Sequence, residues 1–161
     1  MHKSKTNAMR MLDAASIPYE AIEYEHSPHD PVDGVSVARS LQEDPAAVFK
    51  TLVTRSGSSH FVFLVPVDRE LDLKQCARAA GVKSLEMLPL KDLTKVTGYV
   101  RGGCSPVGMK KRFATFADAS LTGHDQVHVS GGQIGLQLKI RPADLIQAAD
   151  IKLAEIARQG E

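Results

Sequence analysis

One lysine and two glycine-rich stretches are the residues of this chain whose types and spacing could do chemistry. Lys50 lies in an apolar segment predicted to be a strand, and Gly102-Gly103-Cys104-Ser105-Pro106 and Ser130-Gly131-Gly132 follow it. Paired glycines let the backbone approach a ligand closely, because no Cβ holds it away. The exposed N–H groups can bind a phosphate, or an ester oxygen that gains negative charge, and a lysine adds a charge suited to a nucleotide phosphate. Together they predict a pocket for an anionic or acyl ligand, with no evident protein nucleophile.

Each glycine loop alone is a weak signal. The first, residues 102–108, can be a cradle of N–H groups or an ordinary irregular connection. It lacks the spacing of a P-loop, and it does not follow a strand and open a helix as a dinucleotide-binding fingerprint does. Lys110, Lys111 and Arg112 come directly after it and either meet a phosphate or form a solvated charge run. The second loop can be a plain hairpin turn, which is the most frequent use of a glycine pair.

The candidate nucleophiles have no activating partner in the sequence. Ser130 is not part of a G-x-S-x-G elbow, so its hydroxyl is interpreted as a group that binds the ligand. Cys104 could accept an acyl group, but no base lies near it in sequence, and a small pocket-lining or packing residue is favoured. Lys50 itself can be an edge lysine that discourages pairing between sheets, and the residues alone leave the two interpretations even.

The histidines give no convincing ligand set. His26, His29 and Asp30 resemble a metal cluster, but the prolines around them keep them off one helix face, so a surface loop is favoured. His128 shares a predicted strand face with Ser130 and can line the pocket. We therefore predict neither a metal site nor a cofactor.

The elements that must position these residues mix strands and helices without strict alternation. Helical segments are predicted at 4–15, 35–41, 73–80, 89–95 and 142–156, with a further helical turn that starts at Asp44-Pro45. Strands are predicted at 19–24, 49–55, 61–67, 84–87, 113–117, 126–130 and 134–140. The strand at 61–67 is apolar almost throughout, so both of its faces are expected to be covered. The expected fold is α/β of the α+β type, with a mixed, barrel-like sheet and packed helices.

Length and composition set limits on the class of protein. At 161 residues, 43% of them apolar, the chain is expected to form a single domain over residues 1–161 with a real core. The net charge of +1 excludes a dense cationic face for duplex nucleic acid, although a single-stranded end can still be gripped. Two cysteines outside any CxxC pair, and no signal sequence or membrane span, predict a reduced cytoplasmic protein.

An ordered set of motifs resembles the YbaK family of bacterial aminoacyl-tRNA deacylases, which is related to the editing (insertion) domain of bacterial prolyl-tRNA synthetases. The resemblance covers nearly the whole chain. The motifs that carry it are Val48-Phe49-Lys50-Thr51-Leu52, Leu71-Asp72-Leu73-Lys74, Thr97-Gly98-Tyr99, the segments 102–111 and 129–136, and Pro142-Ala143-Asp144-Leu145. Each motif alone is unspecific, but the set in this order is strong.

This resemblance implies the barrel-like α/β fold, with the pocket between the sheet and the glycine loops, and it implies roles for particular residues. The expected catalytic residues are Lys50, Gly102 and Gly103. The expected substrate-binding residues are Tyr19, Thr51, Cys104, Ser105, Ser130, Gly131 and Gly132. Family members often carry an acidic residue two positions after the glycine that matches Gly135, and this chain has Gln137 there.

Within the family, the chain looks most like the branch that clears cysteine mischarged onto proline tRNA. The resemblance implies that the substrate's own thiol attacks the ester carbonyl and releases a thiolactone, so the protein supplies orientation and oxyanion stabilisation. It also implies the tRNA acceptor end and prolyl-tRNA synthetase as partners, and no membrane. Two alternatives stay open: a non-catalytic module that binds a tRNA end or a nucleotide, and a deacylase for another small aminoacyl-tRNA such as Ala-tRNA(Pro). The sequence predicts no oligomeric state.

Overall fold

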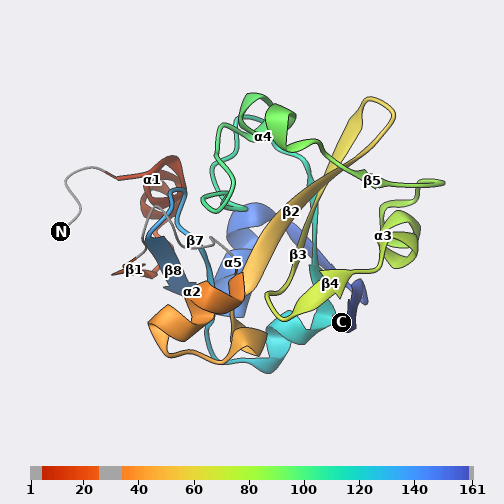
Figure 1. The fold of residues 1–161 in the computed structure, drawn as a ribbon. Helices are drawn as coiled ribbons and strands as arrows, with labels where there is room; N and C mark the ends of the chain where they lie inside the picture. The colour runs from red at the N-terminus through yellow and green to blue at the C-terminus, as the bar shows by residue number, and fades with distance from the viewer. Residues whose placement is uncertain (1–4, 26–33, 160–161) are drawn as a thin grey trace.

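The computed structural model describes residues 5–25 and 34–159 (Figure 1). Its helices are α1 (Asn7–Ala14), α2 (Gly34–Leu41), α3 (Leu73–Ala80), α4 (Leu90–Thr97) and α5 (Pro142–Ala149), with 3-10 turns η1 (Pro45–Ala47) and η2 (Ala119–Gly123). Its strands are β1 (Glu20–Glu23), β2 (Phe49–Ser56), β3 (Ser59–Pro66), β4 (Arg69–Leu71), β5 (Glu86–Met87), β6 (Ala114–Asp118), β7 (Val127–Ser130), β8 (Leu136–Ile140), β9 (Ile151–Ala154) and β10 (Ala157–Gln159).

The strands form one large mixed sheet and two smaller antiparallel ones. The large sheet has the order β5-β2-β3-β6-β9, in which β2 pairs antiparallel with β3 and β5, while β3–β6 and β6–β9 are parallel. A second sheet has the order β1-β8-β7, and β4 pairs with β10. A parallel bridge between Val48 and His128 joins the two larger sheets. The predicted mixed α+β architecture is confirmed, and across the described residues these pairings do not close into a barrel.

Strand β3 lies between two hydrophobic cores. Val62 and Leu64 are fully buried on the side of the larger core, and Phe63 and Val65 are fully buried on the side of the smaller one. Phe63 stacks on Phe116 of β6 at a centroid distance of 5.3 Å. The prediction that both faces of this strand are covered is therefore confirmed, and it makes β3 the rigid support against which β2 is held.

Side-chain caps fix the starts of α1 and α3. The Thr6 hydroxyl accepts a hydrogen bond from the Met9 N–H at the start of α1 and donates one to the Gly131 carbonyl at 2.6 Å. Helix α1 is thereby tied to the second glycine loop. At α3 the Asp72 side chain caps the first turn, and Gly81 ends the helix with φ of 73°, as the sequence predicts.

The prediction of a last helix over residues 142–156 is wrong beyond Ala149, where α5 ends. Asp150 adopts a left-handed conformation with φ of 52°, and the chain continues as β9 alongside β6 and then as β10 alongside β4. Leu153 is 42% exposed, whereas Ile156 is buried in the smaller core. The short strands β4, β9 and β10 were not expected from the sequence, because their few residues carry little periodic signal of their own.

Candidate functional site

A pocket of about 410 Å³ opens beside β2, where that strand lacks a neighbour on one side. Strand β5 pairs with β2 only at Thr54 and Arg55, and the bridge at Val48 marks the other end of the gap. The consecutive residues 48–53 between these pairings all line the pocket. The site is therefore a break in sheet pairing that side chains and loops enclose.

The backbone of Thr51 faces this gap. The Val53 carbonyl accepts a hydrogen bond from the Leu88 N–H on the pocket side at 3.0 Å, and the Val48 carbonyl accepts one from Val67 beside β3 at 2.8 Å. Because main-chain groups alternate between the two sides of a strand, the N–H and C=O of Thr51 point the same way as those of Val53. The Thr51 hydroxyl is also buried without a hydrogen-bond partner among the described residues. A ligand in the gap can thus meet a main-chain donor and a main-chain acceptor.

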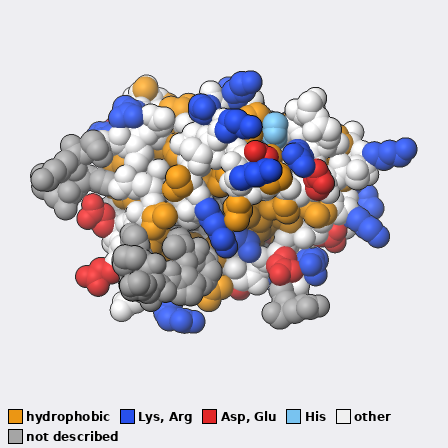
Figure 2. All heavy atoms as spheres, turned by 45° about the horizontal axis from the view of Figure 1, so that its top comes forward, with side chains coloured by type: hydrophobic (Ala, Val, Ile, Leu, Met, Phe, Trp, Pro, Cys, Tyr) orange, Lys and Arg blue, Asp and Glu red, His pale blue; other side chains and the backbone are white. Residues whose placement is uncertain are grey.

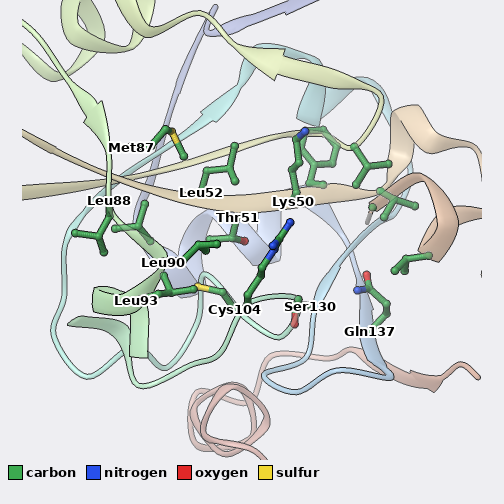
Figure 3. A pocket seen from close by; sticks show the side chains of 18 residues that line it. Lys50, Thr51, Leu52, Met87, Leu88, Leu90, Leu93, Cys104, Ser130 and Gln137 are labelled. Carbon is green, nitrogen blue, oxygen red and sulfur yellow. The ribbon is translucent and has the colours of Figure 1, made fainter. Parts of the chain in front are cut away.

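The pocket has an apolar end and a polar end (Figure 3). Met87 of β5, Leu88, and Leu90 and Leu93 of α4 gather at one end. Ser130 of β7 and Gln137 of β8 lie at the other, with Cys104 between them. This division suits a ligand that has a hydrophobic part and a hydrogen-bonding part.

Two cations and no carboxylate are found among the described residues that line the pocket. Lys50 is partly buried, and this burial lowers its pKa, an effect that the carboxylates of Glu70 and Asp68 oppose. Arg101, at the start of the first glycine loop, is the second cation. Lys50 is partly dehydrated and Arg101 is exposed, and with no carboxylate among the described lining residues both charges are available to an anionic ligand.

The two glycine loops pack against each other. A Cβ built on Gly103 would lie 2.9 Å from the Cα of Gln133, and the Gly103 N–H donates to the Val100 carbonyl. The N–H of Gly131 donates to the Leu136 carbonyl, and that of Gly132 donates to the Ser130 hydroxyl. Gly103, Gly131 and Gly132 are not among the described residues that line the pocket, so the expectation that their N–H groups form the cradle stays a prediction that this lining does not support. Glycine at these three positions lets neighbouring protein atoms pack closely against the backbone.

Of the two glycine pairs, only Gly102 reaches the pocket. It has φ of 81°, a backbone conformation that favours glycine, and no described residue accepts a hydrogen bond from its N–H. The structure therefore brings Lys50, Thr51, Gly102, Cys104 and Ser130 together around one pocket.

Comparisons with known proteins identify the family of this chain. The sequence model of the aminoacyl-tRNA editing domain matches residues 29–148. The chain belongs to this family. It is 42% identical over 155 residues to EbsC of Enterococcus faecalis, whose provisional name is Cys-tRNA(Pro)/Cys-tRNA(Cys) deacylase, and the match covers 96% of this chain and 94% of the relative. The resemblance seen in the sequence is thereby confirmed.

Solved structures share the fold of this editing domain. A structure described as that of a candidate trans-editing enzyme for prolyl tRNA synthetase matches with a TM-score of 0.82 at 21% identity, over 97% of this chain and 99% of the other. The hypothetical protein APE2540 matches with a TM-score of 0.85 at 19% identity, over 94% and 99%. None of the helices described for this chain has the length and hydropathy of a bilayer span.

Besides Gly131 and Gly132, two more of the expected binding residues lie outside the pocket lining. The Tyr19 hydroxyl donates to the Asp13 carboxylate at 2.9 Å, and burial together with this bond raises the pKa of Tyr19 to about 12. Ser105 is fully buried, and its hydroxyl accepts from the Val107 N–H at 3.2 Å. Both side chains hold the local structure.

The lining residues that the structure describes include no activated nucleophile. Burial raises the pKa of the Cys104 thiol to about 11, so the thiolate is scarce at neutral pH. His128 is 2% exposed, does not line the pocket, and has its Nε2 atom 3.5 Å from a Glu43 carboxylate oxygen. In the part of the chain that the structure describes, no group of three His, Cys, Asp or Glu residues could hold a metal ion. The suggested cluster at His26, His29 and Asp30 lies outside the described residues.

Sequence reasoning missed several residues of the lining. Arg101 lines the pocket and stands directly before the first glycine pair, and this position in the sequence could have identified it as a candidate binding residue. Gln137 was noted only as a departure from the family, yet its side chain is 6% exposed and its Oε1 atom lacks a hydrogen-bond partner among the described residues. The spacing of the α4 leucines is typical of an amphipathic helix, and it does not indicate a pocket.

Proposed function

We propose that this editing domain is a deacylase that releases cysteine mischarged onto proline tRNA. The observation that carries the proposal is the pocket lining: among the described residues it holds two cations, Lys50 and Arg101, and neither a carboxylate nor an activated nucleophile. An aminoacyl-tRNA end brings a phosphate and an ester to such a pocket, and cysteine brings its own thiol. The family and the name of EbsC support this substrate class. Because translation takes place in the cytoplasm, we include that location in the proposal.

The proposed reaction is an intramolecular acyl transfer. The cysteine sulfur attacks its own carbonyl carbon and forms a C–S bond, the ester C–O bond breaks, and the thiol proton passes to the ribose oxygen that leaves. The products are a cysteine thiolactone and uncharged tRNA, and water outside the pocket then opens the thiolactone. No protein nucleophile is consumed in these steps, which fits the buried Cys104 thiol.

The protein's part is to orient the ester and to stabilise the oxyanion. The main-chain N–H groups of Gly102 and Thr51 are the donors that the fold leaves available, and one such donor is worth roughly 2.7–4 kcal/mol of barrier. Lys50 binds the terminal phosphate or ribose, which fixes the ester against these donors. A misplacement of about 1 Å can cost on the order of 100-fold in rate, so this positioning is a large contribution.

Chemistry rather than fit distinguishes the amino acid in this proposal. A small pocket separates substrates by only about 1–3 kcal/mol per methylene, so cysteine, serine and alanine can all enter. Only cysteine carries a thiol that cyclises readily. The alternative, a deacylase that uses water, accepts serine and alanine esters equally well.

Single-turnover deacylation of Cys-, Ser- and Ala-tRNA(Pro) tests the proposal. We expect the protein to release cysteine, with serine and alanine released at least tenfold more slowly, and we expect Lys50→Ala to lose most of this activity. Lys152→Ala, an exposed lysine of β9, is the matched control. Equal rates for cysteine and serine would exclude thiol assistance. Protection of the ester against spontaneous hydrolysis would instead identify a non-catalytic tRNA-end binder.

We further propose that prolyl-tRNA synthetase supplies the recognition of the tRNA body. The chain has a net charge of +1, and its pocket offers two cations, which is enough for the acceptor end but not for a long duplex. Adding the synthetase should lower the apparent KM for Cys-tRNA(Pro) and leave that for a short aminoacylated oligonucleotide unchanged. An equal effect on both substrates would argue against a shared complex.

A further inference from the structure

We propose that the mouth of the pocket binds the last nucleotide of tRNA, with Met87 and Leu90 in contact with the adenine base and Arg101 bound to the phosphate. This inference rests on the proposed function and assigns a part of the substrate that the deacylation chemistry leaves open. It also divides the work of the two cations, because Arg101 takes the phosphate and Lys50 is left for the ribose beside the ester.

The apolar end of the pocket becomes more exposed towards the mouth. Leu88 is 8% exposed and Leu93 is partly buried, whereas Met87 is 43% and Leu90 is 59% exposed. Met87 comes from β5 and Leu90 from the first turn of α4, so two different elements bring large apolar side chains to one opening. Figure 2 shows hydrophobic side chains in a band across this side of the molecule, with Lys and Arg side chains along it.

The exposure gradient separates two subsites. Leu88, Leu93 and Cys104 enclose a space that suits a side chain as small as that of cysteine. Met87 and Leu90 are too exposed to enclose such a side chain, but they offer apolar surface to a larger group. A nucleobase is such a group, because its face gains from contact with apolar side chains whatever its hydrogen-bonding edge.

Charge at the mouth fits a phosphate. Arg101 is exposed and forms no ion pair with any described residue, unlike Arg158, which pairs with Glu70 at 2.9 Å. The carboxylate next to the rim in sequence, Glu86, is bound to Arg55 at 2.6 Å, so its charge is compensated. A free guanidinium offers a phosphate two parallel N–H donors.

The covalent order of the substrate matches this layout. The ester is attached to the terminal ribose, which carries the base on one side and the 5′ phosphate on another. With the ester at Gly102 and Thr51, the base and the phosphate are the next groups outward. The apolar rim and Arg101 are the features that the opening presents to them.

Deacylation of three cysteine esters tests the assignment. The substrates are a Cys-CCA trinucleotide, the same trinucleotide with an abasic terminal ribose, and cysteinyl adenosine, which lacks the phosphate. The variants are Leu90→Ala, Met87→Ala and Arg101→Gln. The matched controls are Leu153→Ala, Met11→Ala and Arg78→Gln, which alter exposed residues outside this pocket.

We expect Leu90→Ala to raise KM for Cys-CCA by roughly fivefold to thirtyfold with kcat within about twofold, because a binding contact is lost. On the abasic ester, the same variant should change KM by less than about twofold. Arg101→Gln should raise KM for Cys-CCA by a similar factor and leave KM for cysteinyl adenosine unchanged. It should also reduce the slope of log KM for Cys-CCA against log salt concentration by about 0.7. These pairings isolate the base contact and the phosphate contact.

Equal effects of Leu90→Ala on the Cys-CCA and abasic esters would overturn the base assignment. Leu90 would then contact the amino acid or contribute only to folding. Variants indistinguishable from their controls would overturn the whole inference. If the wild type cleaves none of the esters, the proposed function is wrong. Calorimetric binding of the uncharged trinucleotides then decides the inference separately: the wild type should bind CCA at least fivefold more tightly than the abasic form, and Leu90→Ala should lose that preference.

Discussion

A methyl group on Gly103 would lie 2.9 Å from the Cα of Gln133, so the first glycine loop rests directly on the backbone of the second. Gly102 beside this contact and Ser130 at the start of the second loop both line the pocket, so the contact fixes the two loops relative to each other. The Gly103→Ala substitution forces the loops apart, because backbone atoms cannot move aside as a flexible side chain can.

We predict that Gly103→Ala destabilises the protein by about 1–3 kcal/mol and lowers deacylation more than tenfold. Thermal unfolding and single-turnover kinetics measure the two effects. Gly123→Ala is the control, since a Cβ there meets nothing within 4 Å and its φ is not positive; it should stay within about 1 kcal/mol of the wild type. A Gly103→Ala protein with normal stability and rate would show that the loops are not packed as described.

Lys50 is predicted to matter for activity and not for stability. Burial lowers its pKa, so the folded protein holds the ammonium less well than the unfolded chain does. Lys50→Met removes this cost while keeping an unbranched side chain that is only one heavy atom shorter, and the free energy of unfolding at pH 7 should be equal to or above that of the wild type. Urea denaturation measures it, with Lys152→Met as control. A clear loss of stability would mean that the ammonium makes a structural ion pair.

The pH dependence of stability has a definite sign for this residue. Between the lowered pKa of Lys50 in the folded state and the ordinary value of 10.5, the unfolded chain binds more protons than the native protein. Stability therefore gains a contribution as pH rises through that window. The difference between wild type and Lys50→Met should shrink there, and urea denaturation at several alkaline pH values measures it. A difference that grows with pH would contradict the lowered pKa.

The pH–rate profile should be bell-shaped. Activity rises as the substrate thiol ionises, and it falls as Lys50 loses its proton, at a pH below 10.5 because burial lowers that pKa. Single-turnover rates, corrected for spontaneous ester hydrolysis, give the profile. If Lys50→Arg retains activity, its falling limb should disappear from the accessible range, since arginine keeps its proton. An unchanged falling limb in that variant would assign it to another group.

Cys104 is predicted to be dispensable for chemistry. Its thiol has a pKa raised to about 11 by burial, and it lies between the two ends of the pocket. Cys104→Ser should retain deacylation within about fivefold, because only the packing and polarity of one small side chain change. Mass spectrometry of the protein during turnover should detect no acyl adduct. Loss of activity together with an adduct in the wild type would establish a covalent mechanism.

The sequence predicts the central elements of this fold well, because their signals are strong and local. An unbroken apolar run marks β3, and a capping aspartate and a terminal glycine bound α3. The prediction of a helix up to residue 156 was wrong because apolar residues recur there at helical spacing, namely Ile146, Ala149, Leu153 and Ile156. Pairing of β9 with β6 and burial of Ile156 outweigh that local preference.

The candidate site was predictable where a residue type is unusual for its segment. Lys50 within an apolar strand and the glycine at Gly102 are of this kind, and both line the pocket. Arg101 and Leu90 belong to ordinary segments, and only the gap beside β2 makes them part of a site. All four paired glycines were assigned to the ligand site, yet only Gly102 lines the pocket, because sequence cannot distinguish a close approach to a ligand from a close approach to protein atoms.

The break in pairing beside β2 has a consequence for self-association. An unpaired strand edge invites a second chain to add a strand, and such additions are favoured by long, accessible edges. Here the open stretch runs only from Phe49 to Leu52, closed at one end by the Val48 bridge and at the other by Leu88 on Val53. It is shorter than a usual strand of about 5–6 residues, so it can accept an aminoacyl group while excluding intermolecular sheet growth.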